Sequence, residues 1–265
     1  MEKGPVMRIV ALLGSQRKNG AGARYMGMIE SAVTRNPGVE FETVSLSDYG
    51  IEMCRGCMIC YRLGESACPI RDRLPEVVEK LKAADAVIFY SPTYTVSVSG
   101  LIKNFFDRCS YICHRPVFKG KYALLLTSVG GYGDTQCLRT LGEIVPVFGF
   151  KIMGAIGISS RYDTDAQYAA RMKLRLIRKA DELVRLAGSG KPIKPTRQEL
   201  VAFRYQKIIF GQGAKTLAYD EAYWREAGWL EPETVYYYEA DVPGWKRWVA
   251  GVAVKVLVWV GVLTV

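Results

Sequence analysis

The sequence predicts an α/β fold in which five parallel strands form a central sheet covered by helices on both faces. Two observations predict it. Five short apolar runs, of the kind that forms strands buried on both faces, recur between residues 7 and 158. Between consecutive runs, apolar residues recur at helical spacing, so that strand and helix alternate. Parallel strands joined by crossover helices form a doubly wound, three-layer sandwich.

Each element follows from its own pattern. The strands are expected at Met7–Leu13, Phe41–Leu46, Ala86–Tyr90, Tyr122–Thr127 and Ile152–Ile158. The helices between them are expected around Met26, Ile29 and Val33; Leu74, Val77, Val78 and Leu81; Leu101, Ile102, Phe105 and Phe106; and Leu138, Leu141, Ile144 and Val145. A closing helix is expected to bury Met172, Leu176, Ile177, Ala180, Leu183 and Val184. Glycines and a proline at 188–192 end it, so we expect one domain over 1–187 and an extension over 188–265.

Composition limits the class of protein. The 265 residues are 49% hydrophobic, which suffices for a full core, and the formal charge is +10. A basic chain fits nucleic acid, an acidic membrane surface, anionic cofactors or acidic electron-transfer partners. No nucleic-acid motif accompanies the charge, and the basic stretch 171–179 has apolar residues at helical spacing, so we expect an exposed helix face and no nucleic-acid binding. The single histidine, His114, argues against triad hydrolysis, and the lack of a signal peptide predicts a cytoplasmic protein.

Four cysteines lie close together between the second strand and the second helix. They are Cys54, Cys57, Cys60 and Cys68. Three thiolates at this short repeat cover one face of a [4Fe–4S] cluster and a fourth completes the set, whereas structural zinc prefers two separated pairs. Three further cysteines are scattered in apolar helical contexts: Cys109, Cys113 and Cys137. The pattern therefore favours an iron–sulfur cluster over zinc, and disfavours a disulfide.

The first predicted strand runs into a glycine-rich loop, residues 14–23, that precedes a helix. Such a loop directs backbone N–H groups and the positive end of the helix dipole at an anion, and Ser15, Arg17 and Lys18 add donors and charge. We interpret the loop as a phosphate cradle, with an ordinary polar turn as the alternative. Neither the dinucleotide nor the P-loop glycine motif is present, which argues against both classes.

Two further loops follow the third and fourth strands. In the first, residues 91–100, Pro92 restricts the turn, Tyr94 offers an aromatic face and Ser99 is a candidate helix N-cap. In the second, residues 128–133, glycines allow backbone to approach a flat ring closely. Taken alone, each loop is a weak signal, and its tyrosine alternatively packs on the surface.

Together the motifs G-S-x-R-K-N-G, S-P-x-Y-x-x-x-x-S-G-x-x-K-x-F-x-D-R and T-S-x-G-G, in this order at strand ends, resemble the NAD(P)H-dependent FMN reductase family of flavodoxin-like proteins. The resemblance covers about Met7–Ala187, and the cysteine run makes it closest to the iron–sulfur flavoprotein group. It implies strand order 2-1-3-4-5, one FMN and one [4Fe–4S] cluster per subunit, and a homodimer or homotetramer in which the cluster passes electrons to a flavin across a subunit interface.

The resemblance also implies the site residues. The FMN phosphate would lie on Ser15, Arg17, Lys18, Asn19 and Gly20; the isoalloxazine would be bordered by Ser91, Pro92, Thr93, Tyr94 and Val96 and by Gly130, Gly131 and Tyr132; the cluster would be held by Cys54, Cys57, Cys60 and Cys68 within loop 54–68. The chain departs from relatives at Gly22, where they usually carry a hydroxyl for the phosphate, and in the seven residues between Cys60 and Cys68.

The C-terminal segment changes character. Its aromatic part, 219–248, has a counterpart in some members of the group, and we expect a clasp over the core or over a second subunit. In Val249–Val265, valine at alternate positions predicts a strand in an oligomer interface. Apolar length and flanking tryptophans leave a membrane anchor or surface contact through 245–265 as the alternative, with the protein then peripheral to the membrane.

These features predict an electron-transfer oxidoreductase that uses FMN and a [4Fe–4S] cluster. Its donor would be ferredoxin or NAD(P)H, and no side-chain acid or base is required. One alternative is an NAD(P)H-dependent FMN or quinone reductase without a cluster. The other is a non-enzymatic redox-sensing or docking flavoprotein.

Overall fold

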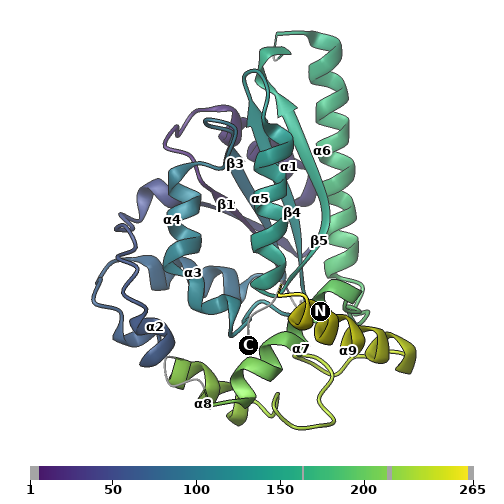
Figure 1. Cartoon of the computed structure of the whole chain (residues 1–265). Helices are drawn as coiled ribbons and strands as arrows, with labels where there is room; N and C mark the ends of the chain where they lie inside the picture. Colours follow the sequence, from purple (N-terminus) through teal and green to yellow (C-terminus); the bar gives the residue numbers. More distant parts are fainter. Residues whose placement is uncertain (1–5, 163, 214–216, 262–265) are drawn as a thin grey trace. The chain divides into compact units, whose positions relative to one another are not determined.

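The computed structural model describes residues 6–162, 164–213 and 217–261 (Figure 1). The chain divides into two compact units, and each is described by itself. Unit 1 comprises Met1–Cys54, Asp72–Cys109 and Gly120–Lys191, and unit 2 comprises Arg55–Arg71, Ser110–Lys119 and Pro192–Val265. Unit 2 therefore contains most of the cysteine loop as well as the C-terminal segment.

Unit 1 is built on the expected five-stranded parallel sheet. Its strands are β1 Met7–Leu13, β2 Val39–Ser45, β3 Ala86–Pro92, β4 Lys121–Val129 and β5 Phe150–Ser159. Their order is β2-β1-β3-β4-β5 and every pairing is parallel, which confirms the predicted topology. All of β3 is buried, as expected for a central strand covered on both faces.

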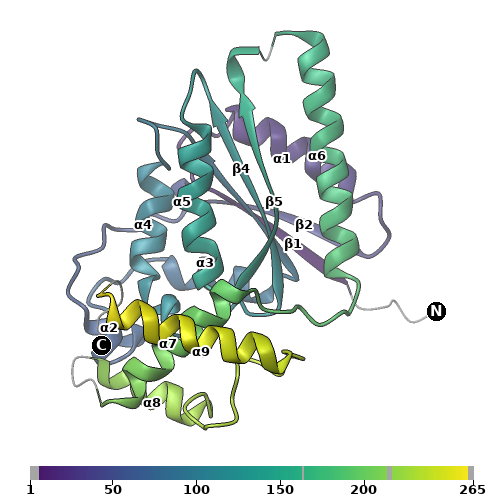
Figure 2. The same cartoon turned by 45° about the vertical axis from the view of Figure 1, so that its right-hand side comes forward.

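Helices cover both faces of this sheet, which gives the three layers (Figure 2). One face carries α1 Ala21–Val33 and α6 Ala166–Ala187, and the other carries α3 Leu74–Ala83, α4 Gly100–Arg108 and α5 Asp134–Val147. The closing helix α6 buries Leu176, Ala180 and Leu183 against the sheet, as predicted. Its basic residues from 171 to 178 are exposed, so they form the expected solvated face.

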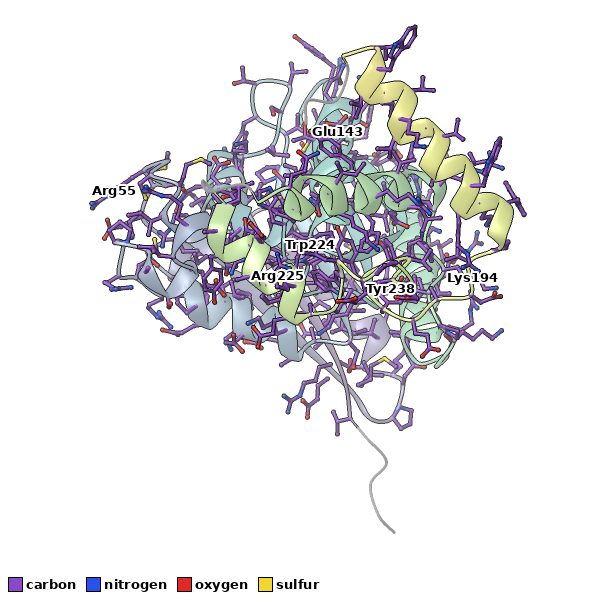
Figure 3. The ribbon with its side chains drawn as sticks, turned by 60° about the horizontal axis from the view of Figure 1, so that its bottom comes forward. Arg55, Glu143, Lys194, Trp224, Arg225 and Tyr238 are labelled. Carbon is purple, nitrogen blue, oxygen red and sulfur yellow. The ribbon has the colours of Figure 1, made fainter. Side chains whose placement is uncertain are left out.

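Unit 2 has a separate aromatic core, of which Figure 3 labels Trp224 and Tyr238. The segment after unit 1 forms α7 Arg197–Gly211, α8 Ala218–Glu226 and α9 Gly244–Trp259, and the cysteine loop contributes the short helix α2 Ile59–Arg62. Trp224 is fully buried at the centre of this core, stacked on Phe203 with ring centroids 5.4 Å apart. Its indole N–H donates to the carbonyl of His114 at 2.7 Å, which satisfies the buried polar end of the ring.

The predicted strand within Val249–Val265 is wrong over the described residues, because this part of the chain forms α9. Ala250 and Val254, one helical turn apart, are buried beside α7, and this packing overrides the strand preference of alternating valines. Residues 262–265 lie outside the described residues. No helix in the described part of the chain is both long and apolar enough to cross a membrane.

Candidate functional site

Three loops of unit 1 meet at one edge of the sheet. They follow the carboxyl ends of β1, β3 and β4, and the register pairs Leu13 with Tyr90 and Pro92 with Ser128. Because β1 and β3 are neighbours while β2 lies on the other side of β1, this edge is the switch point at which doubly wound sheets bind ligands. Of the residues expected to contact flavin, buried ones are Ser15, Ser91 and Pro92; half-buried ones are Gly20, Thr93 and Val96; exposed ones are Arg17, Lys18, Asn19, Tyr94, Gly130, Gly131 and Tyr132.

Hydrogen bonds fasten the first loop to the start of α4. The Ser99 hydroxyl donates to the carbonyl of Gly14 at 2.5 Å, and the Ser91 hydroxyl accepts the N–H of Ser99 at 2.9 Å. Ser99 is also the N-cap of α4, as predicted, since it accepts the N–H of Ile102. A Cβ on Gly14 would lie 2.6 Å from the Cβ of Ile102, so only glycine fits this crossing.

The first loop has the properties of an anion cradle. Ser15 is buried and its hydroxyl accepts the N–H of Arg17 at 3.1 Å, which turns the chain before the helix. The N-cap of α1 is Gly20, which supplies no side-chain acceptor for the first N–H groups of the helix. The free N–H groups, the helix dipole and the guanidinium of Arg17 can therefore stabilise an anion at this helix N-terminus.

Lys18 lies on this loop with a partner of its own. Its ammonium group is 2.8 Å from the carboxylate of Asp48, and both side chains are exposed. The hydrogen bond between them raises the pKa of Lys18 and lowers that of Asp48. Exposed pairs of this kind contribute little to stability, so Lys18 can exchange Asp48 for a phosphate at small cost.

The loop after β3 contains a two-residue hairpin with strained backbone. Tyr94 and Ser97 exchange backbone hydrogen bonds of 3.0 Å, and the residues between them, Thr95 and Val96, have φ angles of 48° and 61°. This left-handed conformation suits Asn-Gly and is costly for β-branched side chains. Such strain persists where the surrounding structure imposes it, and it concentrates at functional sites. The sequence does not predict this turn, because neither Thr95 nor Val96 is a usual turn former.

The loop after β4 lies against that hairpin. A Cβ on Gly133 would be 2.9 Å from the Cα of Val96, and the φ of Gly133 is 103°, so this contact requires glycine. By contrast, a Cβ on Gly130 or Gly131 would meet no atom within 4 Å. The two loops therefore form one rim, along which exposed glycine backbone leaves open space for a flat ring.

The glycine at position 22 of α1 is explained by its contact with Tyr90, a residue that we did not predict for the site. A Cβ on Gly22 would lie 2.3 Å from the Cε1 atom of Tyr90, so the tyrosine ring occupies the space that a side chain here would need. Tyr90 is buried, and its hydroxyl is 2.6 Å from the hydroxyl of Ser128. Burial raises the pKa of Tyr90, with the Ser128 hydrogen bond opposing the shift, so the ring stays neutral.

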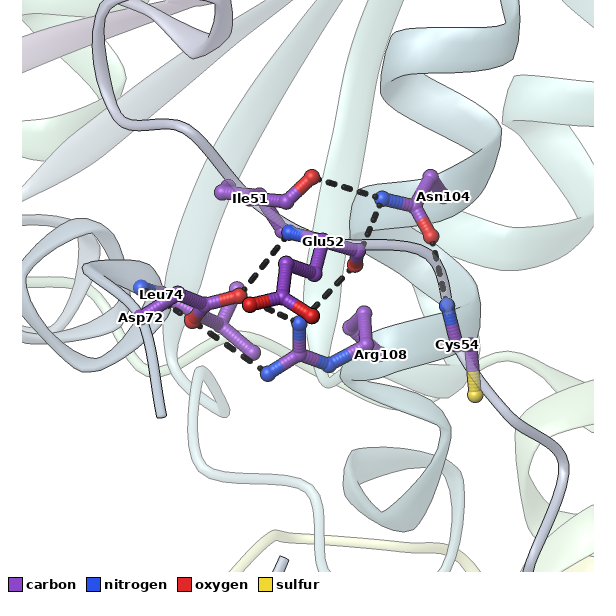
Figure 4. A network of polar contacts seen from close by, with 7 residues as sticks. All are labelled: Ile51, Glu52, Cys54, Asp72, Leu74, Asn104 and Arg108. Atoms are coloured by element: carbon purple, nitrogen blue, oxygen red, sulfur yellow. Dashed lines mark hydrogen bonds and ion pairs between the residues drawn. The ribbon is translucent and has the colours of Figure 1, made fainter. Parts of the chain in front are cut away.

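Two polar residues of α4, one turn apart, hold the chain that leads into the cysteine loop (Figure 4). The side-chain oxygen of Asn104 accepts the N–H of Cys54 at 3.0 Å, and its amide donates to the carbonyl of Glu52 at 3.0 Å. Arg108 donates to the same carbonyl at 2.9 Å. Arg108 is the last residue of the motif that follows the third strand, whereas Asn104 was not singled out from the sequence, although two polar residues at i and i+4 on the buried face of an amphipathic helix are a recognisable signal.

Arg108 is also paired with Asp72 inside unit 1. Their closest atoms are 2.5 Å apart and both side chains are almost fully buried. Asp72 accepts the N–H groups of Glu52 and Leu74 as well, at 2.9 and 3.0 Å. Although burial alone raises the pKa of Asp72, the hydrogen bonds from Arg108 and the backbone outweigh it and hold the pKa below its usual value. The entry to the cysteine loop is thus anchored at an ionised carboxylate.

The rest of the cysteine loop belongs to unit 2. Its backbone turns at Gly56 and Met58, with φ angles of 63° and 59°. None of the seven cysteines, all of which lie among the described residues, forms a disulfide. Four thiols at this spacing are the donor set of an iron–sulfur cluster, so their chemistry fits the group. Across the described residues, however, no three His, Cys, Asp or Glu side chains are arranged to hold a metal ion.

A buried charged cluster in unit 2 joins this loop to α8. Arg115 donates to the carbonyl of Cys60 at 2.9 Å and to Glu65 at 2.6 Å, and its Nε is 2.8 Å from Asp220, which is fully buried. Asp220 also bonds Nδ1 of His114 at 2.6 Å. The histidine thus pairs with a fully buried carboxylate inside unit 2.

The strand order and the three converging loops define a flavodoxin-like protein. Residues 7–165 match the family described as NADPH-dependent FMN reductase. The chain therefore belongs to the NADPH-dependent FMN reductase family, and it is a flavin-dependent oxidoreductase. Because the chain is an oxidoreductase, it is not the non-enzymatic redox-sensing or docking flavoprotein of the third hypothesis.

Proteins named iron–sulfur flavoprotein are among the relatives. One from Archaeoglobus fulgidus is 30% identical over 238 residues, which cover 84% of this chain and 100% of that protein. One from Methanocaldococcus jannaschii is 34% identical over 165 residues, covering 61% of this chain and 80% of the relative. An NADPH:quinone oxidoreductase from Arabidopsis thaliana is 30% identical over 150 residues, covering 53% and 67%.

Solved structures share the fold. An apo NADH:FMN oxidoreductase superposes with a TM-score of 0.52 at 21% identity, over 71% of this chain and 92% of that one. RosB with bound 8-demethyl-8-formylriboflavin-5′-phosphate reaches 0.54 at 15% identity, over 90% and 92%.

Proposed function

We propose that this chain is an electron-transfer oxidoreductase that uses FMN and a [4Fe–4S] cluster. The observation that carries the proposal is the convergence of three loops at the switch point of the sheet, in the same unit in which α4 binds the backbone of Cys54. The names of the iron–sulfur flavoprotein relatives support the second cofactor.

The chain's own residues fit FMN in two parts. The loop at Ser15–Gly20, with its uncapped helix N-terminus, would bind the phosphate together with Arg17 and Lys18. The rim of Ser91–Val96 and Gly130–Tyr132 would border the ring, where exposed backbone N–H groups orient it and Tyr94 and Tyr132 limit access of water. Cys54, Cys57, Cys60 and Cys68 would hold the cluster.

When bound, FMN exchanges one or two electrons and the cluster exchanges one at a time. The residues at the rim supply position and hydrogen bonds, and none of them is required as an acid or base. The donor would be ferredoxin, which suits the basic chain, or NAD(P)H on the exposed face of the ring. We infer a homodimer or homotetramer, in keeping with the family.

Cofactor content tests the proposal directly. The protein is purified without oxygen, and iron, zinc, acid-labile sulfide and flavin are measured. We expect about four irons, four sulfides and one FMN per chain. The variant Cys57→Ser should lose iron and keep flavin, whereas Met53→Ser, at an exposed residue without a thiol immediately before the loop, should keep both. Zinc without iron, or neither metal, would contradict the cluster.

A second candidate is an NAD(P)H-dependent FMN or quinone reductase without a cluster. It is favoured by the lack of a preformed metal group in the described residues and by the quinone oxidoreductase relative. It predicts NAD(P)H-dependent quinone reduction that is unchanged in Cys57→Ser. Loss of electron transfer from ferredoxin in that variant, at full flavin content, would favour the cluster instead.

A further inference from the structure

The helix α9 exposes an apolar stripe, which comprises Trp245, Trp248, Val252, Val256 and Trp259. Successive members are three or four residues apart, so they share one face of the helix. The three tryptophans are 52%, 70% and 85% exposed, and the two valines 40% and 50%. Scattered surface apolar residues are ordinary, but three tryptophans along one exposed face need an explanation.

The opposite face of α9 is already occupied within unit 2. Ala250 and Val254 are buried there, and a Cβ on Gly251 would come within 3.1 Å of the guanidinium of Arg204 on α7. Figure 3 shows side chains projecting from the outer side of this helix. This buried face packs the helix onto its unit, while the tryptophans of the stripe remain more than half exposed.

The charged residues near the stripe indicate which kind of surface it binds. Within α9 the ionisable residues are Lys246, Arg247 and Lys255, and there is no Asp or Glu. The exposed Arg197 of α7 adds a cation, with its guanidinium 5.1 Å from the centre of the Trp245 ring. Tryptophans beside lysine and arginine are typical of helices that lie at a membrane interface, where the indole ring takes up the headgroup region and cations meet anionic lipid.

We propose that the stripe is a docking surface for an anionic lipid bilayer, on which α9 lies parallel to the membrane plane. A second copy of the chain fits the same surface less well. A symmetric contact of the stripe with itself would bring Lys246 and Lys255 of both helices to one seam, and neither helix carries a carboxylate to neutralise them. The anionic headgroups of a bilayer neutralise them directly.

Vesicle flotation of the full-length holoprotein tests the proposal. We expect binding to vesicles of phosphatidylcholine with phosphatidylserine, and little binding to phosphatidylcholine alone. Binding should weaken between about 0.1 M and about 1 M salt, because the Debye length falls from about 10 Å to about 3 Å. Tryptophan emission should shift to the blue on binding, since Trp224 and Trp229 are already buried and the exposed indoles carry the change.

Matched variants assign the binding to the stripe. Trp248→Ser with Trp259→Ser should weaken vesicle binding about tenfold or more, since burying one large apolar side chain contributes on the order of a factor of ten. Lys246→Glu with Lys255→Glu should abolish the preference for anionic lipid. The control is Leu174→Ser, which removes a 55% exposed apolar residue from α6. Flavin content should be unchanged in all of them, which shows that they fold.

Two results would overturn the proposal. One is equal binding of anionic vesicles by wild type and by the tryptophan double variant. The other is no binding of anionic vesicles by wild type. In that second case, a fall in oligomer mass in the double variant, measured by light scattering, would identify the stripe as an interface between copies of the chain.

Discussion

The ring of Tyr90 occupies the space beside Gly22 of α1: a Cβ at position 22 would lie 2.3 Å from its Cε1 atom. The family resemblance led us to expect a hydroxyl near this position for the phosphate. Here Tyr90, a strand residue that packs in the core, leaves no space for a side chain at position 22, so under the proposed function the phosphate would rely on backbone N–H groups and on side chains of the preceding loop.

Substituting Gly22 therefore tests a coupling between two residues. Gly22→Ser should lower the free energy of unfolding by about 1–3 kcal/mol, because it overpacks a rigid site. In a Tyr90→Leu background the same change should cost much less, and the serine hydroxyl should tighten FMN binding. Urea unfolding and flavin titration measure both effects. The control is Gly27→Ser on the same helix, where a Cβ meets no atom within 4 Å; equal costs at positions 22 and 27 would refute the coupling.

The buried pair of Asp72 and Arg108 should make stability depend on pH. The pKa of Asp72 is lowered in the folded chain, so its ionised form stabilises the fold at pH values above the unfolded pKa of about 3.9. That stabilisation is lost as pH falls through the folded pKa. Asp72→Asn should therefore cost about 3–5 kcal/mol near pH 7, where it leaves Arg108 buried without its counter-charge, and progressively less as the solution becomes more acidic.

Unfolding free energies of wild type and Asp72→Asn from pH 7 to the acid limit measure this difference. Glu76→Gln is the matched control, because Glu76 is paired with Arg73 at 2.8 Å in an exposed ion pair. It should change stability little at pH 7, because solvent screens an exposed ion pair. A pH-independent cost of Asp72→Asn would show that the carboxylate contributes only through its shape and hydrogen bonds.

Arg115 should govern the order of the cysteine loop in unit 2, because it donates a hydrogen bond to the carbonyl of Cys60 and forms an ion pair with the buried carboxylate of Asp220. Arg115→Ala should destabilise the fold by about 3–5 kcal/mol, since it leaves Asp220 buried without this partner. Arg115→Lys keeps the charge and loses the planar fork, so it should recover only part of the stability.

Alkylation of Cys60 in cofactor-free protein, followed by peptide mass spectrometry, reports loop order independently of activity. We expect faster alkylation in Arg115→Ala than in Arg115→Lys, and the slowest in wild type. Arg225→Ala, which removes an exposed arginine of α8, should leave the rate unchanged. If Arg115→Ala were destabilised without any change in alkylation rate, Arg115 would support the aromatic core alone.

The strained turn at Val96 should separate stability from flavin binding. Val96→Gly releases about 1 kcal/mol of left-handed backbone strain, so thermal stability should hold or rise. The same change removes a side chain that we expect at the isoalloxazine, so flavin titration should show weaker binding of FMN. Ser97→Ala, next to it in the turn, should change neither. Lower stability in Val96→Gly would mean that the valine contacts outweigh the strain.

Much of unit 1 follows from local patterns. The apolar run of Met7–Leu13 and the periodic apolar face of α6 predict their elements because burial between layers demands these periods. The loops after β1, β3 and β4 could be brought together from sequence as well, since strand order places consecutive carboxyl ends at one edge. Hydrophobic period, turn residues and motif spacing thus determine the fold class and the region of the site.

Other features arise only from contacts between segments distant in sequence. Alternating valines predicted a strand where the structure has α9, because burial of Ala250 and Val254 beside α7 decides between helix and strand. The ring of Tyr90 beside Gly22 and the bond from Asn104 to Cys54 likewise require the folded layers. The sequence alone determined the periods that choose elements; the tertiary structure decided which side chains meet, because packing and buried hydrogen bonds depend on neighbours that local patterns do not specify.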